Sequence, residues 1–301
     1  MSEPTSDHQG IDVSIIIVTY NNEKEIEPCL RSIAMQQGDL QCEIILIDNA
    51  SNDLTRTRMR RSSAALDHVH FVFNTANYGF TRAINQGLAC SNGSYLLLLN
   101  PDVELSAGSL SKLISKIKVQ EHVGIVSPQF LGSDNMIQPS CRRFPRRRDV
   151  WYHAIGLPCL FKKSREFNGW KMGDFDHRSE IFVDQPQGAF LLTSRDAFEK
   201  IGPLDESFPM FFSDVDWCRR FKQQGYEILF TPITKIVHHQ GRSIFQRRLP
   251  LIWSSHRSFY HYFRKYDSSL FAWLLTFVTG LLLLEMAIAR SLLYFITPKN
   301  Q

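Results

Sequence analysis

The sequence predicts an α/β fold: a mostly parallel β-sheet with helices on both faces, followed by C-terminal hydrophobic helices. Short apolar runs such as VSIIIVT at Val13–Thr19 and CEIILID at Cys42–Asp48 are typical of strands buried on both faces. Helical segments separate these runs, and such alternation indicates a parallel sheet. The 301 residues, 44% hydrophobic and 21% charged, suit one large α/β domain with an appendage, or two small domains.

The expected elements follow one another in regular order. Strands are predicted at residues 13–19, 42–48, 70–74, 95–100 and 123–127. Helices are predicted between them at residues 23–37, 52–66, 78–90 and 106–120. Ile26, Leu30 and Ile33 have helical spacing in the first helix, and Ser106 is the expected N-cap of the last.

The alternation stops at about residue 130. Residues 130–183 are basic, aromatic and irregular, and we expect them to form an acceptor-side insertion that covers a site. A strand at 187–193, a helix at 214–224, short strands at 227–231 and 235–238 and two helices within 253–296 complete the prediction. We therefore divide the chain into a disordered N-terminus at 1–10, a main domain at 11–250 and a helical tail at 251–301.

Charge and cysteine content limit the class of protein. A net charge of +4 is too mild to favour nucleic acid as a partner. Six scattered cysteines without a CxxC pair, and an N-terminus without a signal-peptide pattern, indicate reduced thiols in a cytoplasmic protein. The positive charge is concentrated in two arginine groups, Arg142, Arg143, Arg146, Arg147 and Arg148, and Arg242, Arg247 and Arg248.

Ligands of parallel sheets bind at the carboxyl ends of the strands, which here lie just after Thr19, Asp48, Asn74 and Asn100. The Asp48 carboxylate can accept a hydrogen bond from a nucleobase imide, although the polar residues after it also suit helix capping. Asp102, in Asn100-Pro101-Asp102, can hold a divalent cation on a diphosphate. The alternative is that Asn-Pro-Asp is simply a turn.

The strand-to-helix connection after Asn74 contains Gly79 and Arg82. Gly79 permits close approach of the backbone, and the helix N-terminus favours an anion. Arg82 can face a phosphate or lie on a solvated helix face.

Two further groups of residues are candidates for proton transfer and for metal binding. Asp214 and Asp216 precede an amphipathic helix, and one of them can remove a proton from a hydroxyl; otherwise they complement the helix dipole. His238, or the neighbouring His239, can complete a metal site as a neutral ligand, although a lone histidine is more often structural.

The ordered set VTYNN, ILIDNASND, NTANYGF…NQG, YLLLLNPD, GAFLLTSRDAFEKIGPLDE, FFSDVDWCRR and HHQGRS resembles the family-2 glycosyltransferases, most closely their rhamnosyltransferase branch. The resemblance runs from about residue 13 to 243. It implies a GT-A fold, which is Rossmann-like, and inverting transfer of a sugar from a nucleotide-diphosphate donor with Mg²⁺ or Mn²⁺.

The resemblance also implies residue roles. Asp102 matches the metal ligand of the DxD motif, Asp214 the general base of the EDxD motif, and His238 the histidine that reaches the metal or diphosphate, with His239 as the fallback. Gly188 and Ala189 match the strand beside the acceptor. The residues expected on the donor side are Thr19, Tyr20, Asn21, Asp48, Asn77, Gly79, Asn85, Asn100 and Asp102. Asn100 and Ser213 depart from the motifs; because Ser213 replaces a glutamate, Asp216 stays a candidate for the base beside Asp214.

Substrate identity depends on the resemblance alone. The best guess is L-rhamnose from dTDP-L-rhamnose, moved to a lipid-linked or polysaccharide acceptor in cell-surface glycan synthesis; glucose, galactose or N-acetylglucosamine from a UDP-sugar are alternatives. A dinucleotide oxidoreductase would need GxGxxG, and a nucleotidyltransferase a Gly-rich basic loop after the first strand; the sequence has neither. A non-catalytic membrane scaffold derived from such an enzyme remains an alternative.

The tail suggests a membrane. Residues 270–284 are fifteen uncharged, mostly apolar residues, fewer than the roughly 20 of a full span, before Glu285 and Arg290 interrupt the run. A tilted span, a re-entrant hairpin, an in-plane helix and a buried packing helix are all compatible with this pattern. We expect the protein at the cytoplasmic face of the bacterial inner membrane, and a homodimer is left open.

Overall fold

The computed structural model describes residues 10–36, 40–162, 164–239, 248–267 and 269–296. The predicted disorder at 1–10 therefore falls, except for Gly10, outside the described residues, as do Arg242 and Arg247.

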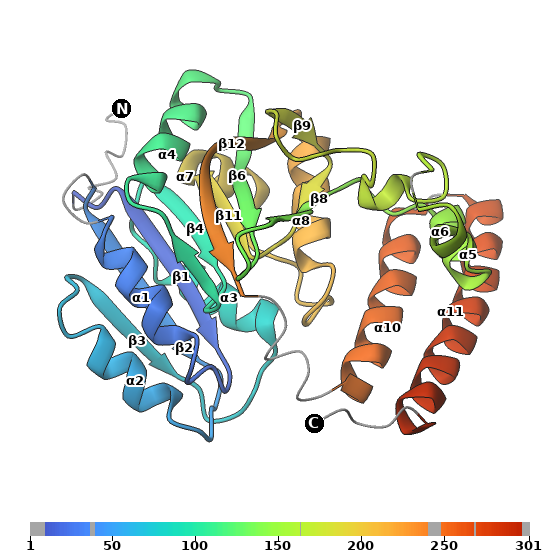
Figure 1. Cartoon of the computed structure of the whole chain (residues 1–301), viewed down its shortest axis with the longest axis horizontal. Coiled ribbons are helices and arrows are strands. Elements are labelled where there is room, and N and C mark those ends of the chain that lie inside the picture. Colours follow the sequence, from blue (N-terminus) through green and yellow to red (C-terminus); the bar gives the residue numbers. More distant parts are fainter. Residues whose placement is uncertain (1–9, 37–39, 163, 240–247, 268, 297–301) are drawn as a thin grey trace, which may run out of the picture.

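One large sheet forms the centre of the molecule (Figure 1). Its strand order is β3-β2-β1-β4-β11-β6-β12-β5, with β7 beside β6 and β9 beside β12. The strands are β1 Val13–Thr19, β2 Cys42–Asp48, β3 Val69–Phe73, β4 Tyr95–Leu99, β5 Val103–Leu105, β6 Val123–Leu131, β7 Ile137–Gln138, β9 Ile181–Val183, β11 Phe190–Ser194 and β12 Glu227–His238. A separate pair joins β8 Cys141–Arg142 to β10 Gln185–Pro186.

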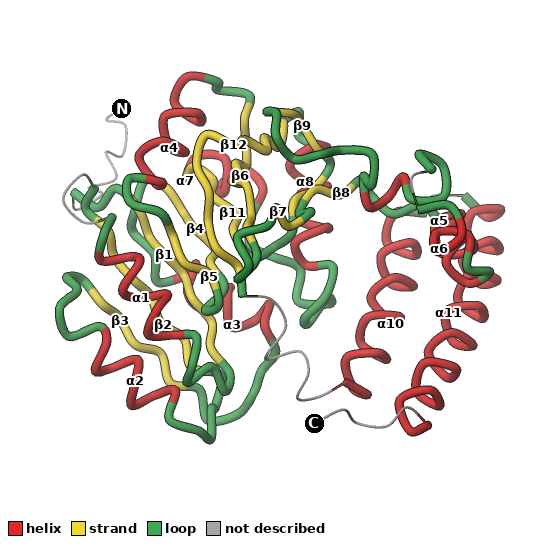
Figure 2. The backbone as a smooth tube through the Cα atoms, viewed as in Figure 1, coloured by secondary structure: helices red, strands yellow, loops and turns green. Residues whose placement is uncertain are grey.

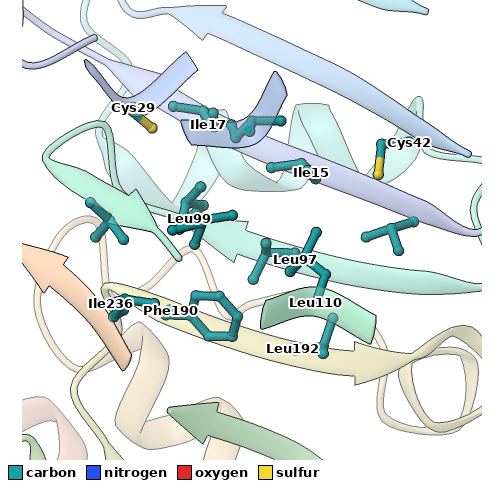
Figure 3. Packing of buried hydrophobic residues seen from close by; sticks show 14 of the residues in the cluster. Ile15, Ile17, Cys29, Cys42, Leu97, Leu99, Leu110, Phe190, Leu192 and Ile236 are labelled. Carbon is teal, nitrogen blue, oxygen red and sulfur yellow. The ribbon is translucent and has the colours of Figure 1, made fainter. Parts of the chain in front are cut away.

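Helices cover both faces of this sheet, as predicted. One face carries α1 Ile26–Ala34, α2 Thr55–Ser62 and α4 Ser109–Val119, and the other carries α3 Phe80–Ala89, α7 Arg195–Ile201 and α8 Ser213–Gln223. Successive residues of β1 serve opposite faces, because side chains alternate along a strand. Ile15 and Ile17 pack with Leu97, Leu99 and Phe190 on the first face (Figure 3), whereas Ile16 and Val18 pack on the second.

The α/β prediction is confirmed, with local differences. β11 runs antiparallel to both β4 and β6, and the three-residue β5 was not predicted. The two short strands expected at 227–238 are one strand, β12, with an irregularity between Thr231 and Lys235. Ser106 is not the N-cap of α4; the helix begins after Gly108, and the Ser106 hydroxyl instead donates to the Lys235 carbonyl at 2.6 Å.

The segment 130–183 contains short elements separated by loops (Figure 2): β7, β8, α5 Arg147–Ala154, α6 Leu157–Leu160, the 3-10 turn η1 Gly169–Lys171 and β9. α5 lies along the last helix, where the Trp151 indole donates to the Thr279 hydroxyl at 3.2 Å. This segment therefore connects the sheet with the C-terminal helices.

The tail forms two helices, α10 Arg248–Tyr266 and α11 Leu270–Ile296, which lie side by side (Figure 1). α10 packs on α8 through an aromatic cluster that contains Phe212, Tyr262 and Phe263. Gly280 allows close contact of the helices, because a Cβ there would lie 2.8 Å from the Tyr260 ring. The tail is thus docked on the sheet domain.

Candidate active site

Several chain segments bring their polar residues to one edge of the sheet. Thr19, Asp48 and Asn100 lie at or after the carboxyl ends of the parallel strands β1, β2 and β4. Ala189 precedes the antiparallel β11, and its carbonyl accepts from the Asn100 N–H at 3.0 Å. His238 ends β12 and pairs with Val103, directly after Asp102. The edge predicted from the sequence is therefore the place where these segments meet.

Asp102 and His238 face each other at this edge. The His238 Nε2 atom lies 3.6 Å from Asp102 Oδ1, and the two side chains are 3% and 15% exposed, respectively. His238 Nδ1 lies 2.7 Å from the Gln138 Oε1 acceptor, so the ring proton is assigned to Nδ1. Burial lowers the pKa of His238 despite the opposing effect of Asp102, so the ring is neutral and Nε2 presents a lone pair toward a carboxylate.

This donor set suits a hard divalent cation. A neutral imidazole nitrogen and a carboxylate oxygen are both metal ligands, and a cation between them would remove the repulsion of two electron-rich atoms. No group of three or more His, Cys, Asp and Glu side chains is gathered as a metal site in the described part of the chain. Any ion held by Asp102 and His238 therefore needs further ligands from a diphosphate or water.

His239 has different contacts. Its Nε2 lies 2.5 Å from Glu104 Oε1 and its Nδ1 lies 2.8 Å from the Ser133 hydroxyl. Of the two histidines, His238 is thus the one that faces Asp102.

Asp214 occupies the first turn of α8, after Phe212 in a left-handed conformation (φ +72°). Its carboxylate lies directly against Gly188, where an added Cβ would be 2.7 Å from Oδ2. Burial raises the pKa of Asp214, although backbone N–H groups, including that of Gly188, act in the opposite direction. A carboxylate with a raised pKa is a better proton acceptor near neutral pH.

Asp216 is fully buried and its oxygens are already occupied. Arg220 donates to Oδ2 at 3.0 Å, while the Lys265 ammonium and the Tyr266 hydroxyl donate to Oδ1 at 2.5 and 2.7 Å. These contacts attach α10 to α8. They give Asp216 a structural role and leave Asp214 as the carboxylate beside Gly188.

Asp48 is also fully buried. Its Oδ2 accepts from Arg56 Nε at 2.6 Å and from the Ser51 N–H at 3.1 Å, and the Thr19 hydroxyl lies 3.4 Å from Oδ1. Arg56, which we had not predicted, is 43% exposed. Because the Asp48 side chain is fully buried and Arg56 already occupies Oδ2, a direct bond from Asp48 to a nucleobase stays a prediction.

The remaining donor-side residues hold loops together. The Asn21 side chain accepts from the Asn52 N–H, and Asn77 Oδ1 accepts from the side chain of Asn49, each at 2.9 Å. Asn85 donates to the Leu204 carbonyl at 2.9 Å. Gly79 (φ +87°) packs on Pro209, and Tyr20 is half-buried after β1. These positions shape the edge of the sheet; their contact with a donor stays a prediction.

The sequence profile described as "Glycosyl transferase family 2" matches residues 14–180, and the chain belongs to that family. The family predicted from the motifs is therefore confirmed.

Individual relatives agree with this assignment. The chain is 26% identical over 76% of its length to the low-salt glycan biosynthesis hexosyltransferase of Haloferax volcanii, and covers 67% of that protein. It is 25% identical over 82% of its length to the N-acetylglucosaminyl-diphospho-decaprenol L-rhamnosyltransferase of Mycobacterium tuberculosis, with 82% of that protein covered.

A solved structure supports the fold. The mannosyltransferase of Pyrobaculum calidifontis in complex with GDP-Man and Mn²⁺ superposes with a TM-score of 0.58 at 19% identity, covering 92% of this chain and 73% of that one. The fold is GT-A.

Proposed function

We propose that this glycosyltransferase moves one sugar from a nucleotide-diphosphate donor to an acceptor hydroxyl, with inversion at the anomeric carbon. The proposal rests on two contacts at one edge of the sheet. Asp102 faces His238, and Asp214 lies against Gly188. The segments that carry these contacts are joined by the hydrogen bond from the Asn100 N–H to the Ala189 carbonyl. The pair suits the diphosphate end of a donor, and Asp214 suits an acceptor hydroxyl.

In the proposed mechanism, the sugar is transferred in a single displacement at the anomeric carbon, and each residue has a separate role. Asp214 takes the proton as the acceptor oxygen attacks the anomeric carbon from the face opposite the diphosphate. Asp102 and His238 would hold Mg²⁺ or Mn²⁺, which neutralises charge on the leaving diphosphate. Because attack and departure occur in one step, no second nucleophilic carboxylate is required, and the engagement of Asp216 with α10 is compatible with catalysis.

The likeness to known relatives supports a proposal for the donor and the acceptor. We propose dTDP-L-rhamnose as the donor, supported by the likeness to the mycobacterial L-rhamnosyltransferase. That enzyme is named for N-acetylglucosaminyl-diphospho-decaprenol, which supports a lipid-linked glycan as the acceptor here. UDP-sugars are the competing donors.

We further propose that the tail binds the surface of the membrane at its cytoplasmic face. Residues Leu270–Tyr294 form a helix long and apolar enough to cross a bilayer, and most of its apolar residues are not buried. The middle of α11 is bound to α5 through Arg147–Thr276 and Trp151–Thr279 contacts, which favours an in-plane helix over a spanning one. A chain ending at Tyr266 should lose binding to vesicles; a truncated chain that still binds them would remove α11 from this role.

The direct test of the function is a panel of nucleotide sugars, each with Mg²⁺ and with Mn²⁺, offered to the purified protein and to Asp214→Asn. We expect transfer from one donor, with turnover reduced about 10²–10⁴-fold in the variant while calorimetry detects unchanged donor binding. Undiminished turnover in Asp214→Asn would remove Asp214 from the role of base. No metal-dependent reaction with any donor would favour a non-catalytic scaffold.

A further inference from the structure

Helix α10 packs on the residue that precedes the first turn of α8. The ring of Phe212 lies against the rings of Phe259 and Tyr262, with centroids 4.4 and 5.4 Å apart. Phe212 is buried and has the left-handed conformation (φ +72°) from which α8 begins. A bulky residue keeps this conformation only where its surroundings hold it. The aromatic contacts with α10 therefore hold the start of α8.

The same helix holds the residue two positions after Asp214. The Lys265 ammonium and the Tyr266 hydroxyl donate to Asp216 Oδ1 at 2.5 and 2.7 Å, and the Asp216 side chain is fully buried. The Asp216 N–H donates to the Phe212 carbonyl at 2.8 Å, which closes the first turn of the helix. Along the chain, α10 thus contacts this turn both before and after Asp214.

Lys265 also joins this turn to the loop that precedes it. Its ammonium donates to Asp205 Oδ2 at 2.7 Å as well as to Asp216. Although burial acts in the opposite direction, hydrogen bonds from Lys265 and Ser207 lower the pKa of Asp205 to about 2, so its carboxylate is charged at neutral pH. Without the ammonium, two neighbouring carboxylates would repel each other. Lys265 therefore keeps the loop closed on the first turn of α8.

The Asp214 carboxylate has little room on its other side. It lies against Gly188, where an added Cβ would be 2.7 Å from Oδ2 and 2.9 Å from the Asp214 Cβ. A shift of the turn therefore changes the position of the carboxylate relative to the strand expected beside the acceptor.

We infer that Lys265 and Tyr266 are positioning residues of the transfer reaction, which act through Asp216 to keep the Asp214 carboxylate beside Gly188. The inference rests on the proposed function, since it concerns the same base. α10 lies side by side with α11, the helix proposed to bind the membrane. The tail then contributes to the chemical step in addition to binding the membrane.

The test compares two lysines that form ion pairs at opposite ends of α8. Lys265→Gln removes the ammonium at its first turn, and Lys222→Gln removes the 2.7 Å pair with Glu227 at its last turn. The two lysine side chains are similarly exposed, at 29% and 24%. Tyr266→Phe, which removes a single hydroxyl, is the second variant if Lys265→Gln folds poorly. All variants are made in the full-length chain.

The expected result is a loss of kcat without a loss of donor binding. A misplacement of about 1 Å can cost about 10²-fold in rate, so a shift of half that size corresponds to roughly tenfold. We expect kcat to fall about tenfold in Lys265→Gln and about threefold in Tyr266→Phe, with donor affinity in calorimetry unchanged. Lys265→Arg should recover part of the loss, and Lys222→Gln should keep the kcat of the wild-type protein.

A second experiment separates positioning from a purely structural role. If Lys265 acts by positioning the base, adding Lys265→Gln to Asp214→Asn should cause little further loss, because the base is already absent. Losses that multiply would overturn the inference. An equal loss of kcat in Lys222→Gln, or an unchanged kcat in both Lys265→Gln and Tyr266→Phe, would also overturn it.

Hydrogen exchange separates this inference from the proposed function. The Asp216 N–H should exchange faster in Lys265→Gln than in the wild-type protein, and its rate should not change in Lys222→Gln. If no nucleotide sugar supports transfer, the proposed function fails, while faster exchange would still support α10 as the element that holds the turn of Asp214. Unchanged exchange in Lys265→Gln would overturn the inference whatever the activity.

Discussion

Substitution of Gly188 by alanine should disable the enzyme by displacing its base. An added Cβ would lie 2.7 Å from Asp214 Oδ2, 2.9 Å from its Cβ and 3.1 Å from its Cγ, whereas ordinary contact begins at 3.4 Å. The carboxylate must therefore retreat by about 0.7 Å. A misplacement of about 1 Å at a reacting group can cost about 10²-fold in rate, so we expect kcat to fall about 10²-fold.

The assay is turnover at saturating donor and acceptor, with unfolding by urea as a check of stability. Gly173→Ala is the matched control, because its Cβ would meet the Lys162 carbonyl at 3.5 Å, an ordinary contact. If Gly188→Ala acts through Asp214, adding it to Asp214→Asn should cause little further loss. Normal turnover in Gly188→Ala, or a double variant whose losses multiply, would refute this reasoning.

Other consequences follow from the same contacts. Asp216→Asn should lower the free energy of unfolding by about 1–3 kcal/mol, seen in the urea midpoint, because it weakens the buried hydrogen bonds that the carboxylate accepts from Arg220, Lys265 and Tyr266. Burial raises the pKa of Asp214 above 3.8, so kcat/KM should fall as the pH decreases through that raised value; a profile that is flat down to about pH 4 would exclude this base. Mn²⁺ should increase the affinity of the wild-type protein for the donor, as measured by calorimetry, and Asp102→Ala should abolish this increase. His238→Ala should weaken that gain more than His239→Ala; the reverse order would exchange their roles.

Much of the fold could be predicted from local patterns. The apolar runs of β1 and β2 specify strands buried on both faces, and the rule for strand carboxyl ends located the edge where Asp48 and Asp102 lie. β5 was not predicted because a strand of three residues is too short to show an alternation of apolar and polar side chains. The antiparallel direction of β11 depends on the path of the chain through 130–183, which has no regular pattern.

The details of the site depend on contacts between distant residues. Apart from the family motif, which favours Asp214, the sequence offered Asp216 as an alternative base, and its contacts with Lys265 and Tyr266, 49 and 50 positions away, could not be predicted from the sequence. Arg56 was visible only as one charge in a basic helix, although its place at the start of α2 puts it beside Asp48.

The register of β12 decided between the two histidines. His238 pairs with Val103 and faces Asp102, while His239 turns to Glu104. Adjacent residues of a strand point to opposite sides, so a shift of one position would have exchanged these contacts.

Diffraction from crystals grown with Mn²⁺ and a non-hydrolysable nucleotide-diphosphate sugar tests the central claim most directly. The anomalous signal of manganese should lie between Asp102 Oδ1 and His238 Nε2, within about 2.0–2.3 Å of each ligand, with the anomeric carbon turned toward Asp214. A metal bound elsewhere, or a sugar turned away from Asp214, would contradict the proposed site.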